Sequence, residues 1–299
     1  MAEHHHHHHE VSGKNLLITI LLNVLITVSQ IVGGFLSGSL ALLSDAMHNF
    51  SDVLALLIAW GANRLAAKPG TESRTFGYKR AEILAALFNA SVLIAVAVFL
   101  IVEAVRKFLH PEPIASGWVI GLGLLSILLN AASVLLVKED AKESMNVRAA
   151  YLHLLTDVMT SAAVVVGGVL MYYWQLFWVD PLISVLIALY LIWASFDLVR
   201  ESGAILMQFT PRGVDVEAVA EAIEEEPEIA NAHHLHLWQL DDKRIFLEAH
   251  LDFREDLPLS KATEVIDRIE RKLHDAFGIE HSTFQCEYGR NDNKERIVQ

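Results

Sequence analysis

The sequence predicts an all-α transmembrane domain of six helices, followed by a small α/β domain with the element order αββαβ. Three observations indicate this fold class: long charge-free runs before residue 207, two His-x-x-x-Asp pairs within apolar surroundings, and a strongly acidic C-terminal region. Of the 299 residues, 53% are hydrophobic and 20% are charged, and the mean hydropathy is +0.37. Because soluble domains usually carry about 25% charged residues, this composition is typical of a membrane protein.

Residues 1–13 are interpreted as a tag and linker. They contain His4–His9, a run typical of a purification tag, which accounts for six of the 15 histidines. We therefore assign no metal function to this run.

Five blocks have no charged side chain: residues 15–44, 83–102, 114–137, 158–179 and 182–196. A helix needs about 20 apolar residues to span a bilayer, and most of these blocks are that long. With the Gly- and Pro-containing breaks between them, they predict helices over about 15–36, 40–66, 81–108, 115–137, 147–174 and 178–205. We therefore expect residues 14–207 to form the transmembrane transport domain.

Basic residues predict the orientation of these helices. One set of connections carries most of them: Arg64, Lys68, Arg74, Lys79, Arg80, Lys138, Lys142 and Arg148. The opposite connections carry only Arg106 and Lys107. Because cytoplasmic loops are enriched in Lys and Arg, both termini are expected to lie in the cytoplasm.

His48 with Asp52, and His153 with Asp157, form two pairs with a spacing of four. This spacing places both side chains of a pair on one helical face. Each ionisable group at membrane depth costs roughly 2.5–3.5 kcal/mol, so the four need a compensating partner. Two nitrogen and two oxygen ligands suit a tetrahedral divalent cation such as zinc. The sequence therefore predicts a metal site inside the membrane.

Other interpretations of these pairs remain open. A single His-x-x-x-Asp pair is more often a hydrogen bond or a solvated turn than a metal site. Asp45 is a possible further ligand, although the Ser44-Asp45 pair is better interpreted as the capping position at the start of a helix. An intramembrane metalloenzyme is the alternative from another functional class, but hydrolytic zinc sites usually keep an open position and a separate general base.

Residues 208–290 are predicted to form a soluble acidic domain, followed by a polar tail at 291–299. Residues 208–299 contain 21 acidic and 11 basic residues, so most of the net charge of −13 lies there. The pattern predicts a helix over 214–226, strands over 229–240 and 245–253, a helix over 260–277 with Ser260 as its N-cap, and a strand over 281–287. Two helices on one face of a small sheet are the natural packing. The acidity argues against nucleic-acid binding.

Histidines are frequent in this domain. Along the first strand, simple alternation places His234 and His236 on one face and His233 on the other. His250 on the second strand and Glu287 on the third allow another metal site across the sheet, although surface histidines on strand edges are common without one.

These residues together resemble the cation diffusion facilitator family, specifically its bacterial zinc-type branch. The likeness lies in residues 39–52, 75–82, 153–157, 179–181 and 233–238, and it covers residues 14 to about 289. The resemblance implies a homodimeric zinc efflux transporter that works as a proton-coupled antiporter by alternating access, and that is not an enzyme. It implies the bacterial inner membrane, zinc as the transported ion, and cadmium or cobalt as further substrates.

The same resemblance implies which residues bind metal. His48, Asp52, His153 and Asp157 match the intramembrane ligands of the family. His233, His250 and Glu287 match positions that bind metal in the cytoplasmic domain of relatives, with His236 and His281 as weaker candidates. A membrane-embedded zinc sensor that binds without transporting remains the alternative function. Channel-like conduction is less compatible with four chelating ligands, which would slow the exit of an ion.

Overall fold

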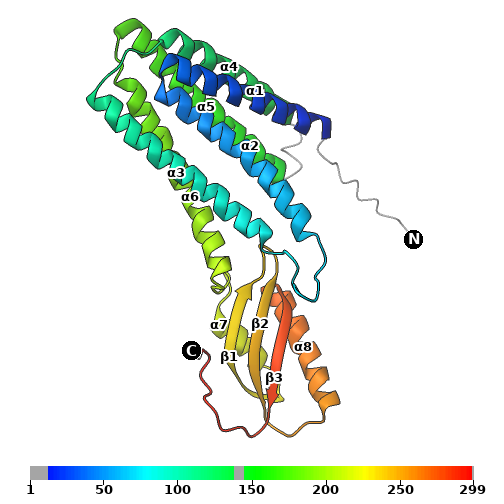
Figure 1. The fold of residues 1–299 in the computed structure, drawn as a ribbon. Helices are drawn as coiled ribbons and strands as arrows, with labels where there is room; N and C mark the ends of the chain where they lie inside the picture. The colour runs from blue at the N-terminus through cyan, green and yellow to red at the C-terminus, as the bar shows by residue number, and fades with distance from the viewer. Residues whose placement is uncertain (1–12, 138–144, 298–299) are drawn as a thin grey trace. The chain divides into compact units, whose positions relative to one another are not determined.

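The charge-free runs of the sequence form long helices. The computed structural model describes residues 13–137 and 145–297, and within them the N-terminal part forms six helices (Figure 1). These are α1 (Gly13–Ser37), α2 (Leu40–Ala66), α3 (Ala81–Leu109), α4 (Ser116–Val137), α5 (Met145–Trp174) and α6 (Val179–Leu206). Their bounds agree with the predicted ranges to within two residues. The predictions for His4–His9, Lys138 and Lys142 concern positions outside the described residues.

Four helical segments are long and apolar enough to cross a membrane: Ala81–Leu109, Ser116–Leu135, His153–Trp174 and Val179–Leu206. Large side chains such as Phe99, Leu128 and Trp193 are more than half exposed on these helices. Exposed apolar surface of this kind indicates contact with lipid rather than water. The helical region is therefore of transmembrane type, whereas the number of six spans stays a prediction.

Small residues allow close contact between α4 and α5. A Cβ atom added to Gly123 would lie 2.5 Å from a methyl group of Val165, and one added to Gly168 would lie 2.9 Å from Ile120. Such stripes of small residues are the usual means by which membrane helices approach one another. The contact fixes α5, which carries one of the two His-x-x-x-Asp pairs.

Helix α2 begins four residues earlier than the predicted cap at Ser44 and Asp45, so that interpretation is wrong. Its first backbone N–H groups are instead satisfied by another helix, because the Asp180 carboxylate accepts from the N–H of Leu40 at 2.8 Å and of Ala41 at 3.2 Å. Free N–H groups in the first turn of a helix need such an acceptor. Asp180, in the first turn of α6, therefore supplies the cap of α2 from 140 residues away.

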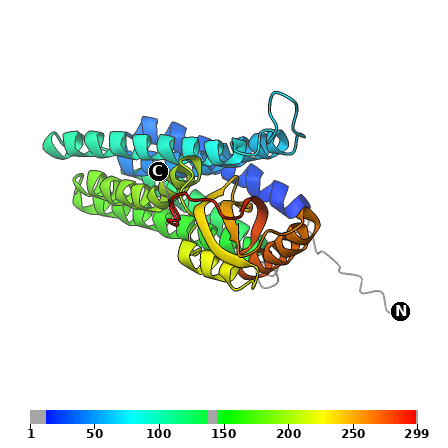
Figure 2. The same ribbon diagram turned by 90° about the horizontal axis from the view of Figure 1, so that it is seen from below.

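The C-terminal part has the predicted order αββαβ, with α7 (Val216–Glu224), β1 (Ile229–Gln239), β2 (Ile245–Phe253), α8 (Leu259–Phe277) and β3 (Ile279–Glu287). The sheet order is β1-β2-β3, with β1 antiparallel and β3 parallel to β2. Both helices cover one face of the sheet (Figures 1 and 2), where Ile223, Leu247 and Ile269 belong to a shared buried core.

Ser260 does not cap α8, contrary to the prediction. The N-cap is Pro258, and no side chain forms a capping hydrogen bond there. The helix ends at Gly278, whose φ of +68° is the left-handed conformation that favours glycine.

The described chain forms two compact units, one from residues up to 58 together with 88–197, and one from 59–87 together with 198 onward. In the second unit the chain after β3 returns along β1. The N–H of His234 donates to the carbonyl of Glu295 at 3.2 Å, and the N–H of Leu235 donates to that of Arg296 at 2.7 Å. The predicted polar tail is therefore paired with the sheet up to residue 296.

Candidate metal centres

Helices α2 and α5 bring the two His-x-x-x-Asp pairs together. We call His48, Asp52, His153 and Asp157 the helix cluster; one ligand atom from each lies within 4.8 Å of all the others. The sequence spacing aligns each pair along its own helix, and the packing of the helices places the two pairs opposite one another.

The shortest contacts of the helix cluster run between the helices. Nε2 of His48 lies 3.1 Å from Oδ1 of Asp157, and Nε2 of His153 lies 3.2 Å from Oδ2 of Asp52. Within each helix the corresponding distances are 3.8 Å for His48 to Asp52 and 4.0 Å for His153 to Asp157. Each imidazole therefore faces both carboxylates.

This spacing fits a tetrahedral metal ion. Ligand atoms about 2.0–2.2 Å from zinc lie about 3.3–3.6 Å from one another in a tetrahedron, and the four nitrogen–oxygen distances of the cluster, from 3.1 to 4.0 Å, are close to this range. Oδ2 of Asp52 lies near His153 without hydrogen-bond geometry, and neither this atom nor Oδ2 of Asp157 has a hydrogen-bond partner among the described residues, although both atoms are buried. Buried acceptors without a partner are costly, and a bound cation would satisfy both.

The helix cluster has a buried side and an accessible side. The side chain of Asp157 is 1% exposed and that of His48 is 8% exposed, whereas those of Asp52 and His153 are 22% and 44% exposed. An ion can therefore reach two of the four side chains from the surface before it contacts the other two.

A second layer of polar side chains supports the helix cluster, and the sequence analysis missed it. Asp45 is buried one turn before His48, and its Oδ2 accepts hydrogen bonds from Gln30 at 2.5 Å and from Ser161 at 2.9 Å. The side-chain amide of Asn49 donates to Oε1 of Gln30 at 2.9 Å. This network joins α1, α2 and α5 beside the cluster. The sequence did contain a signal for this network, because Gln30 and Asn49 are polar residues within apolar stretches.

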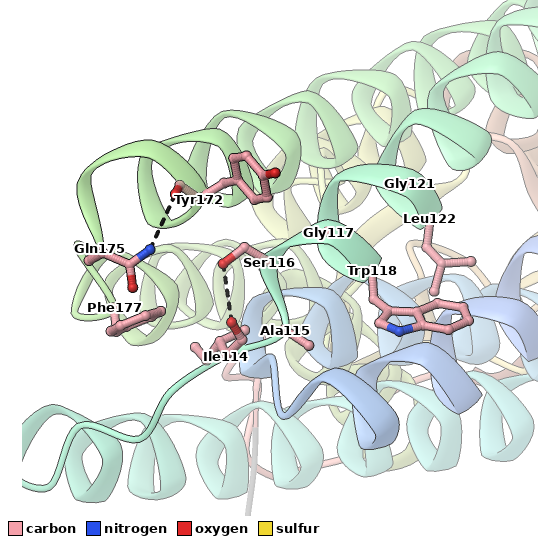
Figure 3. Close-up of a pocket in the computed structure, with 10 residues that line it drawn as sticks. All are labelled: Ile114, Ala115, Ser116, Gly117, Trp118, Gly121, Leu122, Tyr172, Gln175 and Phe177. Carbon is pink, nitrogen blue, oxygen red and sulfur yellow. Dashed lines mark hydrogen bonds between the residues drawn. The ribbon is translucent and has the colours of Figure 1, made fainter.

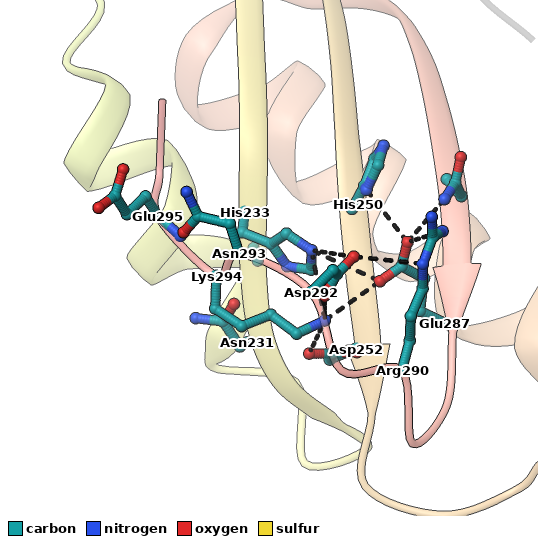
Figure 4. A network of polar contacts seen from close by, with 12 residues as sticks. Asn231, His233, His250, Asp252, Glu287, Arg290, Asp292, Asn293, Lys294 and Glu295 are labelled. Carbon is teal, nitrogen blue, oxygen red and sulfur yellow. Dashed lines mark hydrogen bonds and ion pairs between the residues drawn. The ribbon is translucent and has the colours of Figure 1, made fainter. Parts of the chain in front are cut away.

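A second cluster forms across the sheet (Figure 4). We call His233, His250, Glu287 and Asp292 the sheet cluster; again one ligand atom from each lies within 4.8 Å of the others. His233 on β1 is paired with His250 on β2, and Glu287 ends β3 beside them. Nδ1 of His250 lies 3.1 Å from Glu287, and Nε2 of His233 lies 3.5 Å from Glu287 and 3.8 Å from Asp292.

The position of His233 contradicts simple alternation along β1. His234 has a φ of +51°, and the register between β1 and β2 shifts between His233 and His236. This irregularity buries His233 within the sheet cluster. His236 lies opposite Glu248, and His281 contacts the ring of Phe246, so neither belongs to the cluster.

Two basic side chains from the chain after β3 also reach the sheet cluster. Nζ of Lys294 lies 3.2 Å from Glu287 and 2.7 Å from Asp252, and it also contacts Asp292. Arg290 contacts Glu287 at 2.7 Å. Burial lowers the pKa of Lys294, but hydrogen bonds to Asp252, Asp292 and Glu287 outweigh it and raise the pKa above its usual value. The side chain of Lys294 therefore carries a positive charge.

The donor set of the sheet cluster fits a metal such as zinc, because two imidazoles and two carboxylates converge in a mostly buried position. Nδ1 of His250 lies near Glu287 but lacks hydrogen-bond geometry, so this buried nitrogen has no hydrogen-bond partner among the described residues. Burial, reinforced by the nearby charge of Lys294, lowers the pKa of His233, which favours the neutral imidazole that binds metal.

A cavity of about 850 Å³ lies elsewhere, between the start of α4 and the end of α5 (Figure 3). Its polar side chains bond locally: Ser116 donates to the carbonyl of Ile114 at 3.2 Å, and Gln175 donates to that of Tyr172 at 3.2 Å. Among the described residues, the lining contains no carboxylate, imidazole or thiol, so these residues offer no metal ligands of the kinds found in the two clusters.

Comparison with known proteins adds independent information. The family described as the cation efflux transmembrane domain matches residues 16–207, and the cation efflux protein cytoplasmic domain matches residues 211–288. These ranges contain all of the helix cluster and all of the sheet cluster except Asp292.

Curated relatives match over most of the chain. The cadmium, cobalt and zinc/H(+)-K(+) antiporter of Bacillus velezensis is 33% identical over 287 residues, which is 95% of this chain and 91% of the relative. Zinc transporter ZitB of Pectobacterium atrosepticum is 34% identical over 98% of this chain and 91% of its own length. Metal cation efflux system protein CzcD of Cupriavidus metallidurans is 34% identical over 92% of this chain and 86% of its own length.

Proposed function

The chain belongs to the zinc-type cation diffusion facilitator family, and from this membership we propose that it exports zinc across a membrane in exchange for protons. This is a family of cation transporters rather than of enzymes. The observation that carries the proposal is the helix cluster, in which two imidazoles and two carboxylates from α2 and α5 meet at distances that suit a tetrahedral ion.

Ligand chemistry supports the exchange with protons. Zinc binds the neutral imidazoles of His48 and His153 and the ionised carboxylates of Asp52 and Asp157, so its binding releases protons and protonation releases zinc. If the cluster opens alternately to the two sides of the membrane, protons arriving from outside displace zinc and then return inward. Rocking of helices around a fixed central site is the usual form of such alternation.

Zinc is the substrate that the ligand set favours. Two nitrogen and two oxygen donors suit zinc, while cadmium and cobalt remain further substrates, because ligand type alone separates these ions weakly. The Bacillus relative is named for cadmium, cobalt and zinc, and the Cupriavidus relative is named for metal cations in general.

The sheet cluster is proposed as a separate metal site in the cytoplasm. Three of its members, His233, His250 and Glu287, lie within the range that matches the cytoplasmic domain of cation efflux proteins. We propose that metal bound there regulates a homodimer of this chain, with both termini in the cytoplasm and the protein in the bacterial inner membrane. The transport domain is assigned to residues 14–207 and the cytoplasmic domain to residues 208–290.

Growth of a bacterium without its own zinc exporters tests this function. The wild-type chain should restore growth at high zinc concentration, and Asp52→Ala should not, because the helix cluster loses a ligand. Asp197→Ala is the matched control, since Asp197 is an exposed acid on α6. The amounts of the three proteins in the membrane are compared by immunoblot. Restored growth with the Asp52→Ala chain at equal amounts would remove the helix cluster from the transport pathway.

A further inference from the structure

The sheet cluster already contains a cation in the described structure: the ammonium group of Lys294. Its Nζ lies 3.2 Å from Glu287 Oε2 and 3.5 Å from Nε2 of His233, and it contacts Asp292 (Figure 4). These are the atoms that a metal ion would bind. We propose that Lys294 is a tethered competitor for metal, which occupies the sheet cluster at low metal concentration and must leave when a divalent ion binds.

Charge balance supports this role. Glu287 is almost completely buried, with 3% of its side chain exposed, and Asp252 and Asp292 are 16% and 19% exposed. Partly buried carboxylates close together repel one another unless a positive charge lies between them. Lys294 supplies that charge together with Arg290, which contacts Glu287 at 2.7 Å and Asp292 at 3.3 Å. Among the described residues, Lys294 is the only basic side chain in contact with all three carboxylates.

A metal ion and the ammonium group cannot occupy the cluster together. A divalent ion bound to His233 and Glu287 would lie close to Nζ, and two cations at such a distance repel strongly in a partly buried site. The side chain of Lys294 is 30% exposed, so it can turn from the cluster into solvent when a metal ion binds.

The backbone around Lys294 keeps the lysine tethered during this exchange. The carbonyls of Glu295 and Arg296 accept hydrogen bonds from β1, and Arg296 contacts the Glu224 carboxylate. Residues 295 and 296, which directly follow the lysine, therefore hold position 294 close to the cluster. The lysine can return as soon as the metal leaves, and its competition sets a threshold metal concentration for loading.

This inference rests on the proposal that the sheet cluster binds metal. It extends that proposal to residues beyond the part of the chain that matches the cytoplasmic domain, which ends at residue 288. It assigns Lys294 the role of a competitor that lowers the metal affinity of the cluster rather than a role as ligand.

Zinc titration of the full chain in detergent provides the first test. The protein lacks the His4–His9 run and carries Asp52→Ala and Asp157→Ala, so that the sheet cluster is the site under measurement. In this background Lys294→Gln should bind zinc at least about tenfold more tightly, because the competitor is gone. Lys294→Arg, which keeps the charge, should stay close to the parent. Lys272→Gln is the matched control, since Lys272 is paired with Glu225 on the surface of the same domain.

A structural role for Lys294 predicts the opposite sign. If the lysine only held Asp292 in place, Lys294→Gln would bind zinc more weakly, or as tightly as the parent, and the inference would be overturned. If neither the parent nor Lys294→Gln bound zinc, and His250→Ala changed nothing, the sheet cluster would not be a metal site. That result would overturn the metal assignment itself, with the inference that rests on it.

Amine labelling of the parent chain tests the displacement without changing Lys294. Zinc should increase the rate of Lys294 acylation several-fold, measured by mass spectrometry, because the amine gives up its contacts with Glu287 and Asp292. The rate at Lys272 should stay constant. Zinc binding with an unchanged or slower rate at Lys294 would contradict the displacement.

Discussion

Nε2 of His48 on α2 lies 3.1 Å from the carboxylate of Asp157 on α5, closer than it lies to Asp52 of its own helix at 3.8 Å. The shortest interaction in the helix cluster therefore joins two helices. A metal ion placed among these ligands would connect α2 with α5, so metal binding and helix packing should be energetically coupled.

The first prediction follows from this coupling. In a chain that lacks the His4–His9 run and carries His250→Ala in the sheet cluster, zinc at about 100 times its dissociation constant should stabilise the protein by about 2.7 kcal/mol, which appears as an increase in the Tm of the detergent-solubilised protein. Asp157→Asn should lose most of this increase. Asp197→Asn, which changes an exposed acid, should keep it. An equal increase in both variants would mean that zinc stabilises the protein through another site.

The second prediction concerns the buried Asp45. Its Oδ2 holds both Gln30 and Ser161, so Asp45→Ala leaves two buried donors without their acceptor. The free energy of unfolding should fall by about 1–3 kcal/mol. Reversible unfolding in mixed detergent micelles measures this change. If the free energy of unfolding fell by less than about 0.5 kcal/mol, as expected for a surface substitution, the network would not contribute to stability.

The third prediction concerns the cap that α6 provides for α2. Asp180→Ala removes the acceptor for the N–H groups of Leu40 and Ala41. The free energy of unfolding should therefore fall by about 1–3 kcal/mol. Asp180→Asn keeps one oxygen acceptor and should cost less. Equal stability of Asp180→Ala and the wild type, measured by unfolding in detergent, would contradict this role.

The fourth prediction is a pH dependence in the C-terminal domain. Hydrogen bonds from Arg296 lower the pKa of Glu224 below its ordinary value of 4.5. A carboxylate with a lowered pKa contributes stability that is present above the ordinary value and is lost as the pH falls through the lowered one. The Tm of this domain should therefore fall as the pH falls below 4.5, the ordinary value of this carboxyl group.

The Glu224→Gln variant isolates this contribution, because the glutamine does not titrate. Its Tm should be lower than that of the wild type at pH 6, and the difference should shrink as the pH falls below 4.5. A difference that stays constant with pH would contradict the linkage between Glu224 ionisation and stability.

Most of the fold was predictable, because the relevant signals are local. A charge-free run predicted α4 over 115–137, where the structure has Ser116–Val137, and strand alternation predicted β2 over 245–253, as the structure has it. The spacing of four within each His-x-x-x-Asp pair aligned His48 with Asp52 and His153 with Asp157. The distance between the two pairs could not be predicted from the sequence, because it depends on the packing of α2 against α5.

The parts that were missed depend on contacts between distant residues. Asp45 resembled a helix cap in the sequence, but α2 begins earlier because Asp180 caps it. His233 was assigned to the wrong face, because the left-handed φ of His234 interrupts the alternation of β1. Asp292 and Lys294 belong to a polar stretch without periodicity, and only its pairing with β1 brings them to the sheet cluster.

The central claim is that zinc crosses the membrane through the helix cluster in exchange for protons. Zinc flux into proteoliposomes under an imposed pH gradient tests it most directly, with the chain lacking His4–His9 compared with its Asp157→Ala variant. The account predicts uptake that follows the direction of the gradient and vanishes in the variant. Flux that is absent from both proteins while zinc still binds would indicate a sensor, and equal flux in both would contradict transport through this cluster.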